Sequence, residues 1–81
     1  MKIRFLNRNT VLMNARTNAD IVKWMMKHDY DSTYLQNMNL FMKSYSERKA
    51  LYENKSIRFD SVDLFVADLV SNSIIELVDN G

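Results

Sequence analysis

Few side chains in this sequence are equipped for acid–base or nucleophilic chemistry. The chain contains one histidine, His28, and no cysteine, so His28 is the only histidine that could serve as the base for a nucleophile, and a thiolate metal site has no ligands. His28 falls near the end of a predicted helix, where the helix dipole favours a cation. Acidic residues are present, but no pattern places two of them together in an apolar pocket. The sequence therefore predicts a protein that is not an enzyme.

The pair Asp29 and Asp31 beside His28 raises the question of a bound metal ion. A calcium loop beginning at Asp29 requires glycine at its sixth position and glutamate at its twelfth, but those positions hold Tyr34 and Leu40. A phosphate-binding loop requires internal glycines, and the only glycine is the last residue. We therefore expect no metal and no cofactor.

Charge is distributed unevenly along the chain. All eleven lysine and arginine residues lie within residues 2–58 together with five acids, which gives that stretch a formal charge of +6. Residues 59–81 contain the other five acids and no base, a formal −5. A basic N-terminal hairpin is suited to an acidic partner or a phosphate backbone. Alternatively, the acidic C-terminal segment folds back beside the hairpin and cancels its charge locally.

The candidate partner-binding residues are basic or aromatic and lie in the first third of the chain. The first 16 residues hold four bases and no acid, and the first predicted helix carries two lysines on its polar face. The single tryptophan lies at the edge of the apolar face of that helix, a position suited equally to a core and to an interface. The candidates are Lys2, Arg4, Arg8, Arg16, Lys23, Trp24 and Lys27.

Alternation of polar and apolar residues predicts short strands. Residues 2–6 alternate as a strand does, residues 10–14 are suited to return beside them, and residues 7–9 would form the loop of this hairpin. Further extended segments are expected at 57–59 and 74–78. The last segment is too apolar to lie free in solvent. We expect it to pack beside residues 57–59 or the hairpin, or alternatively to pair across a two-fold axis.

Two of the three predicted helices are marked by capping residues and by apolar spacing. The first begins with a capping box at residues 17–20 and runs to about residue 28. The third begins with a similar pattern at residues 60–63 and runs to about residue 71. Its apolar face includes Phe65, which we expect in the core.

The second predicted helix is the longest, at about residues 33–53, with Asp31 or Ser32 as its N-cap. Alternating spacings of four and three place one aromatic stripe along it, and leucines flank the stripe on both sides. The stripe comprises Tyr34, Met38, Phe41, Tyr45, Arg48 and Tyr52. So wide an apolar arc suggests a central helix that is covered on most of its circumference, with Phe41 buried.

Together these elements predict one α+β domain over residues 1–81, with three helices and a small sheet built from the N-terminal hairpin and a short C-terminal strand. An all-α fold with the extended segments as packed loops is the alternative. No apolar run approaches the length of a membrane span, and the N-terminus lacks the apolar core of a signal peptide. We therefore expect a cytoplasmic protein without a membrane partner.

The C-terminal half also carries a resemblance. The residues Tyr34-x3-Met38, Glu47-Arg48, Ile57-Arg58 and Asp63-x-Phe65-Val66-Ala67-Asp68-Leu69 resemble the layout of short uncharacterised open reading frames in bacteriophages and prophages. The resemblance implies no particular activity. It implies a small mobile-element protein, of a kind that often works by binding and altering another factor.

The sequence therefore predicts a non-enzymatic macromolecule-binding protein, an adaptor or inhibitor that acts by occluding a protein partner. The first alternative is a nucleic-acid-binding regulator that uses the basic N-terminal stretch, although the sequence pI of about 8.0 is below the usual basic footprint. The second alternative is a homodimeric structural or assembly protein, because a core of this size without disulfides is only marginally stable alone.

Overall fold

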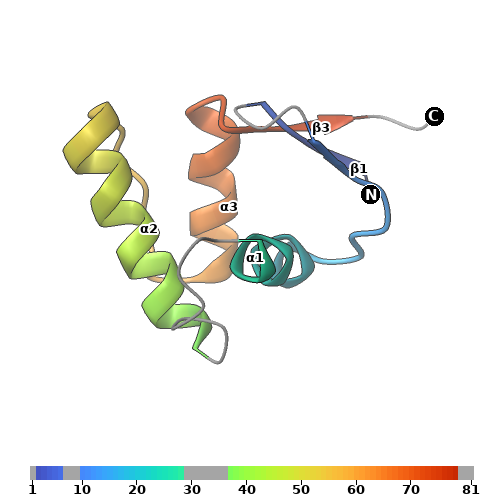
Figure 1. Cartoon of the computed structure of the whole chain (residues 1–81), viewed down its shortest axis with the longest axis horizontal. Coiled ribbons are helices and arrows are strands. Elements are labelled where there is room, and N and C mark those ends of the chain that lie inside the picture. The colour runs from blue at the N-terminus through green and yellow to red at the C-terminus, as the bar shows by residue number, and fades with distance from the viewer. Residues whose placement is uncertain (1, 7–9, 29–36, 79–81) are drawn as a thin grey trace.

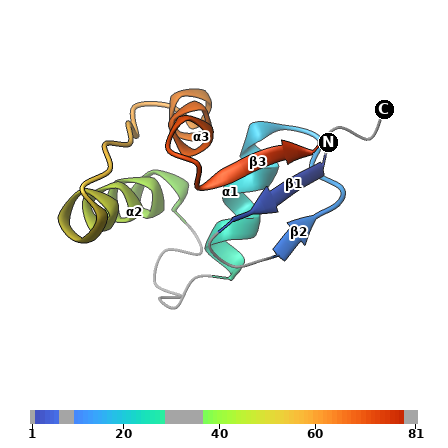
Figure 2. The same cartoon turned by 90° about the horizontal axis from the view of Figure 1, so that it is seen from above.

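The computed structural model describes residues 2–6, 10–28 and 37–78, which form three helices and three strands (Figure 1). This is the predicted α+β fold. In chain order the elements are β1 (Lys2–Phe5), β2 (Thr10–Leu12), α1 (Asn18–Lys27), α2 (Met38–Glu53), α3 (Val62–Ser71) and β3 (Ile75–Val78). Helix α3 lies between α2 on one side and α1 with the sheet on the other, as both ribbon views show (Figures 1 and 2).

The sheet is antiparallel, with the order β2-β1-β3. Its first two strands are the predicted hairpin, although both end earlier than expected, and the predicted loop at 7–9 lies outside the described residues. Strand β3 pairs with β1 from Lys2↔Val78 to Phe5↔Ile75. The C-terminal segment therefore packs on the domain beside the hairpin, as one of the sequence-based expectations proposed.

Residues 57–59 do not form the predicted strand. Ile57 is buried in the core, and Arg58 ties this segment to α3 instead of to the sheet. The Arg58 guanidinium donates two hydrogen bonds of 2.9 Å to the Asp68 carboxylate, and the Arg58 amide donates a third at 2.8 Å. These bonds hold the pKa of Asp68 below its ordinary value, with the guanidinium as the largest cause.

Helix α1 begins with the predicted capping box. The Thr17 hydroxyl accepts from the Asp20 amide at 3.3 Å, and the Asp20 carboxylate accepts from the Thr17 amide at 3.3 Å. Two donors that the helix itself leaves unpaired are thereby satisfied. The buried face consists of Ile21, Val22, Met25 and Met26, and the helix ends at His28 as predicted.

Helix α2 begins at Met38, later than predicted, because Asn37 is its N-cap and accepts from the Leu40 amide at 3.0 Å. The predicted caps Asp31 and Ser32, with the first residues of the predicted helix, lie outside the described residues. The helix ends at Asn54, which adopts the left-handed conformation at φ 55°. Asparagine accepts this conformation more readily than most residues do.

The prediction of a central, largely covered α2 is wrong. The helix lies at one side of the molecule (Figure 1), and Leu51 and Tyr52 are 75% and 77% exposed. The buried face runs through Phe41 and Met42 to Ser46 and Lys49, which is rotated away from the predicted aromatic stripe. Only one side of α2 packs against α1 and α3. The apolar residues on that side are therefore buried, and those on the other sides stay exposed.

The core centres on rings from α2 and α3. Phe41 and Phe65 are both fully buried, and their ring centroids lie 6.5 Å apart in an edge-on arrangement. Tyr45 completes the group with its ring 5.6 Å from that of Phe65. The predicted burial of Phe41 and Phe65 is confirmed.

The connection from α3 to β3 is a tight reversal. Ser73 adopts φ 58°, its amide donates to the Val70 carbonyl at 3.0 Å, and the Ile74 amide donates to the Leu69 carbonyl at 2.9 Å. This pair of bonds is the Schellman arrangement, and the burial of both Leu69 and Ile74 matches the apolar contact that accompanies it. The reversal directs β3 straight back along β1.

Candidate binding surface

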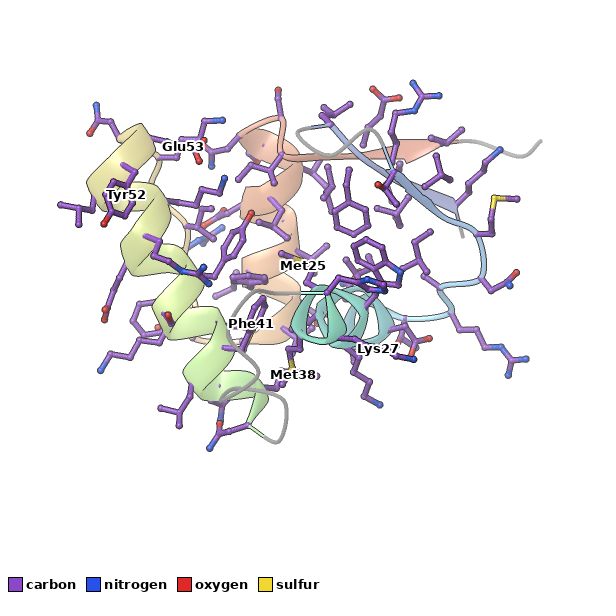
Figure 3. The ribbon with its side chains drawn as sticks, in the orientation of Figure 1. Met25, Lys27, Met38, Phe41, Tyr52 and Glu53 are labelled. Atoms are coloured by element: carbon purple, nitrogen blue, oxygen red, sulfur yellow. The ribbon has the colours of Figure 1, made fainter. Side chains whose placement is uncertain are left out.

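Three of the candidate residues lie together on α1. Lys23 and Lys27 are exposed and one helical turn apart, and Trp24 lies beside them, half-buried. Figure 3 shows Lys27 on the side of α1 that faces away from the sheet. We call Lys23, Trp24, Lys27 and the adjoining His28 the α1 surface.

The Trp24 side chain is held between two other rings. Its centroid lies 4.4 Å from that of Phe5 on β1 and 4.2 Å from that of His28, with interplanar angles of 20° and 29°. Phe5 is buried whereas His28 is exposed, so the stack leads from the core to the surface. An aromatic ring fixed in this way has little conformational freedom left to lose when it meets a partner.

The sequence predicted Trp24 as a candidate but missed the stack. Trp24 and His28 are spaced i,i+4, which places two side chains on one helix face. The sequence could therefore have predicted the contact between these two rings. The contact with Phe5 joins a strand to a helix and depends on how the sheet packs on α1. Nothing in the local sequence indicates that contact.

The lysines of the α1 surface have little acidic compensation. In the described part of the chain, no salt bridge joins Lys23 or Lys27 to a carboxylate. The nearest acid on the helix, Asp20, has a pKa below its ordinary value, chiefly because the Arg16 amide donates to it at 2.9 Å, with a smaller effect from Lys23. The carboxylate of Asp20 is thus engaged in capping the helix, and the two ammonium groups face solvent.

The other basic candidates lie elsewhere. Lys2 and Arg4 alternate with the buried Ile3 and Phe5, so they lie on the face of the sheet opposite α1. Arg4 pairs with Glu76 of β3 at 3.5 Å, which neutralises part of the basic hairpin with the acidic segment. Arg16 is exposed just before α1, and Arg8 lies outside the described residues. The structure therefore places Lys2 and Arg4 on a different face from Lys23, Trp24 and Lys27.

Three further searches, for a metal site, for a membrane-spanning helix and for similar proteins, found nothing in the described residues or in the sequence. Among residues 2–6, 10–28 and 37–78, no three histidine or acidic side chains come close enough together to hold a metal ion. In the same residues, no helix has the length and apolar character that crossing a bilayer requires. No protein-family model, curated protein or solved structure matches the chain at a significant level.

Proposed function

We propose that this chain is a non-enzymatic protein-binding module that docks on an acidic surface of its partner through the α1 surface. One observation carries the proposal: Trp24 is held by stacking on Phe5 and His28 and is flanked by Lys23 and Lys27, neither of which forms a salt bridge within the described residues. Tryptophan is prominent among residues that dominate interface energetics. Exposed cations increase the rate of association with an acidic partner.

Within this proposal the molecule acts as an adaptor or as an inhibitor that covers part of its partner. The resemblance of the C-terminal half to phage and prophage reading frames supports such a role, since small mobile-element proteins often act by altering another factor.

The proposal is tested by comparing variants of the α1 surface. Trp24 is the only tryptophan, so its fluorescence reports directly on that surface. A partner captured from the source cell is purified and titrated against the parent chain, W24A, the double variant K23E/K27E and the control K43E, whose lysine is exposed on α2.

We expect W24A to weaken binding about 30-fold or more, the equivalent of about 2 kcal/mol. K23E/K27E is expected to slow association and to reduce its dependence on salt, whereas K43E behaves as the parent does. Circular dichroism establishes that each variant is folded. A captured partner that binds W24A and K23E/K27E as tightly as the parent, without change in tryptophan fluorescence, would contradict the proposal.

Nucleic-acid binding is the second candidate function, because Lys2, Arg4, Arg8 and Arg16 supply four bases within 16 residues. The pairing of Arg4 with Glu76 argues against one continuous phosphate track. We expect only weak, salt-sensitive binding to a random duplex. Micromolar or tighter binding at physiological salt, lost when these four residues are neutralised, would reverse the order of the two candidates.

A further inference from the structure

The two rings that hold Trp24 cover both faces of its indole. The Phe5 ring lies at 4.4 Å and the His28 ring at 4.2 Å, and both are close to parallel with the indole. Among the described residues no ring contact joins Phe5 to His28, so the two rings lie on opposite faces. A partner therefore reaches Trp24 at the edge of the indole and not at its π faces.

The edge of the indole carries one polar group, the Nε1–H, which is a donor only. Within residues 2–6, 10–28 and 37–78, the Trp24 side chain makes ring contacts and no hydrogen bond. In the same residues, Ser46 Oγ is the one buried side-chain nitrogen or oxygen without a partner, so the unbonded N–H of Trp24 is reached by solvent. The fold thus leaves an oriented donor at the surface.

Lys27 supplies a second donor beside this N–H. It follows Trp24 by three positions, a spacing that brings two side chains together on the surface of a helix. Lys23 precedes Trp24 by one position, and immediate neighbours on a helix do not face one another. The Lys27 side chain is exposed and forms no salt bridge within the described part of the chain. Trp24 and Lys27 therefore present two donors that no described acceptor occupies.

We propose that Trp24 Nε1 and Lys27 Nζ together bind one carboxylate of the partner, an aspartate or glutamate side chain that accepts a hydrogen bond from each. A carboxylate has two oxygens and only accepts, so it satisfies both donors at once. Hydrogen bonds to an ionised acceptor are about twice as strong as neutral ones. The inference rests on the proposed function, and it names the group on the partner that the α1 surface recognises.

The stacking also suits the indole to an anion. The edge of an aromatic ring is positive and its faces are negative, and here the faces are covered by Phe5 and His28. A ring held on both faces cannot turn freely, so the direction of the N–H is set before the partner arrives. A donor that is already oriented loses little freedom on binding.

The first test follows the indole N–H by NMR, because Trp24 is the only tryptophan and gives a single indole resonance. The probe is a short peptide in which glutamate and alanine alternate, and its counterpart has glutamine in place of glutamate. We expect the glutamate peptide to move the indole proton resonance downfield and to saturate with a Kd of about 1 mM or below. The glutamine peptide is expected to leave the resonance in place. Inorganic phosphate is the third probe.

The second test removes one donor at a time and measures the affinity of the labelled glutamate peptide by fluorescence polarisation. Replacement of Trp24 by 3-benzothienylalanine puts a sulfur in place of the N–H and keeps the shape of the stacked rings. We expect this replacement to weaken binding about tenfold. K27Q is expected to weaken binding about threefold. The matched control K23Q removes the same charge and is expected to have a smaller effect, since Lys23 does not face the indole. Thermal unfolding establishes that each variant is folded.

Several results would overturn the inference. They are a parent chain that does not bind the glutamate peptide, an indole resonance that stays in place while the peptide binds, unchanged affinity of the benzothienylalanine chain, and an effect of K23Q as large as that of K27Q. A larger movement of the resonance with inorganic phosphate than with the glutamate peptide at equal concentration would show that a phosphoryl group is the occupant instead.

The captured partner separates this inference from the proposed function. A partner whose binding W24A weakens, but which binds the benzothienylalanine chain as tightly as the parent, would retain the α1 surface as the binding surface and overturn the carboxylate site alone. A partner that is weakened by both changes supports both.

Discussion

Phe65 is the residue on which the helices converge, because its ring touches both Phe41 and Tyr45 of α2. F65A leaves a cavity among rings that cannot close around it. We expect a loss of about 3–5 kcal/mol in the free energy of unfolding, measured with urea. Y52A is the matched control, since Tyr52 is exposed; its effect is expected within about 0.5 kcal/mol. An F65A chain as stable as Y52A would contradict this description of the core.

The Asp68–Arg58 pair gives a pH-dependent contribution to stability. The pKa of Asp68 is lowered in the folded chain, first by the Arg58 guanidinium and then by the Arg58 amide. A carboxyl group with a lowered folded pKa stabilises the fold above its unfolded pKa of about 3.9 and loses that contribution as pH falls through its folded value. We expect D68N to be less stable than the parent at pH 7.

The difference between parent and D68N should shrink as pH falls below about 4, which urea unfolding at pH 7 and pH 3 measures. E47Q serves as the control for the loss of one carboxylate, since Glu47 is exposed on α2. A difference in the free energy of unfolding between parent and D68N that widens toward pH 3 would contradict a stabilising Asp68–Arg58 pair.

The sequence predicted the burial of a residue where helical spacing determines it. It did not predict burial that depends on contacts between residues far apart in the sequence. Phe41 and Phe65 were identified because each lies on an apolar face with neighbours at helical spacing. Ser46 is polar and lies outside the predicted aromatic stripe, yet it is buried. The sequence pattern of α2 is apolar over more than half its circumference, so local periodicity does not choose between its faces.

At the scale of the elements, the turn between α3 and β3 holds one residue in a conformation that lowers the stability of the fold and that a substitution could relieve. Ser73 has φ 58°, a conformation that costs a residue with a Cβ roughly 1–2 kcal/mol and costs glycine little. We therefore expect S73G to raise stability, by up to about 1 kcal/mol after the larger chain entropy of glycine is included. Thermal and urea unfolding provide the measurement.

The neighbouring S71G is the appropriate comparison for S73G. Ser71 is the last residue of α3, where glycine weakens a helix by up to about 1 kcal/mol relative to alanine. The two substitutions are expected to have opposite signs. Destabilisation by both would show that the Ser73 conformation carries no strain.

Element boundaries followed from the sequence wherever a side chain caps a helix by itself. Thr17 begins α1 as predicted, and α3 begins within the predicted start at residues 60–63, with Ser61 as its N-cap, because each capping bond joins residues only three apart. The start of α2 was missed because several residues before Asn37 are equally suited to cap a helix. The strand at 57–59 was also wrong, since the bonds of Arg58 to Asp68 satisfy that segment without a ladder.

At the scale of the whole molecule, the C-terminal segment is a structural part of the domain. Ile74 and Ile75 are buried in the core, and β3 pairs along the whole of β1. Deletion of residues 73–81 uncovers Ile3 and Phe5 and leaves β1 paired only with the short β2. We expect the truncated chain to lack a cooperative thermal transition. Unchanged thermal stability together with unchanged mass in solution would show that β3 is neither core nor interface.

The order of the strands was the least predictable property of the molecule. The sequence left open whether the last strand pairs with residues 57–59, with the hairpin or with a second copy, because each choice buries the same apolar side chains. The charge pattern pointed to the hairpin, and Arg4 does pair with Glu76. A pair at 3.5 Å between half-exposed side chains contributes little energy, so burial of Ile3, Phe5 and Ile75 decides the topology.

The central position of β1 has a consequence for the timing of folding. Arg4 and Glu76 face one another across 72 positions of sequence, so the middle strand of the sheet is made before both of its neighbours, and β3 is made long after β2. During synthesis β1 has only β2 beside it, and its other edge stays unpaired until residues 74–78 emerge. Contacts of such long separation slow folding, and the exposed strand is open to wrong pairings meanwhile. A circularly permuted chain that joins the two ends would place β3 and β1 in one local hairpin and remove this delay.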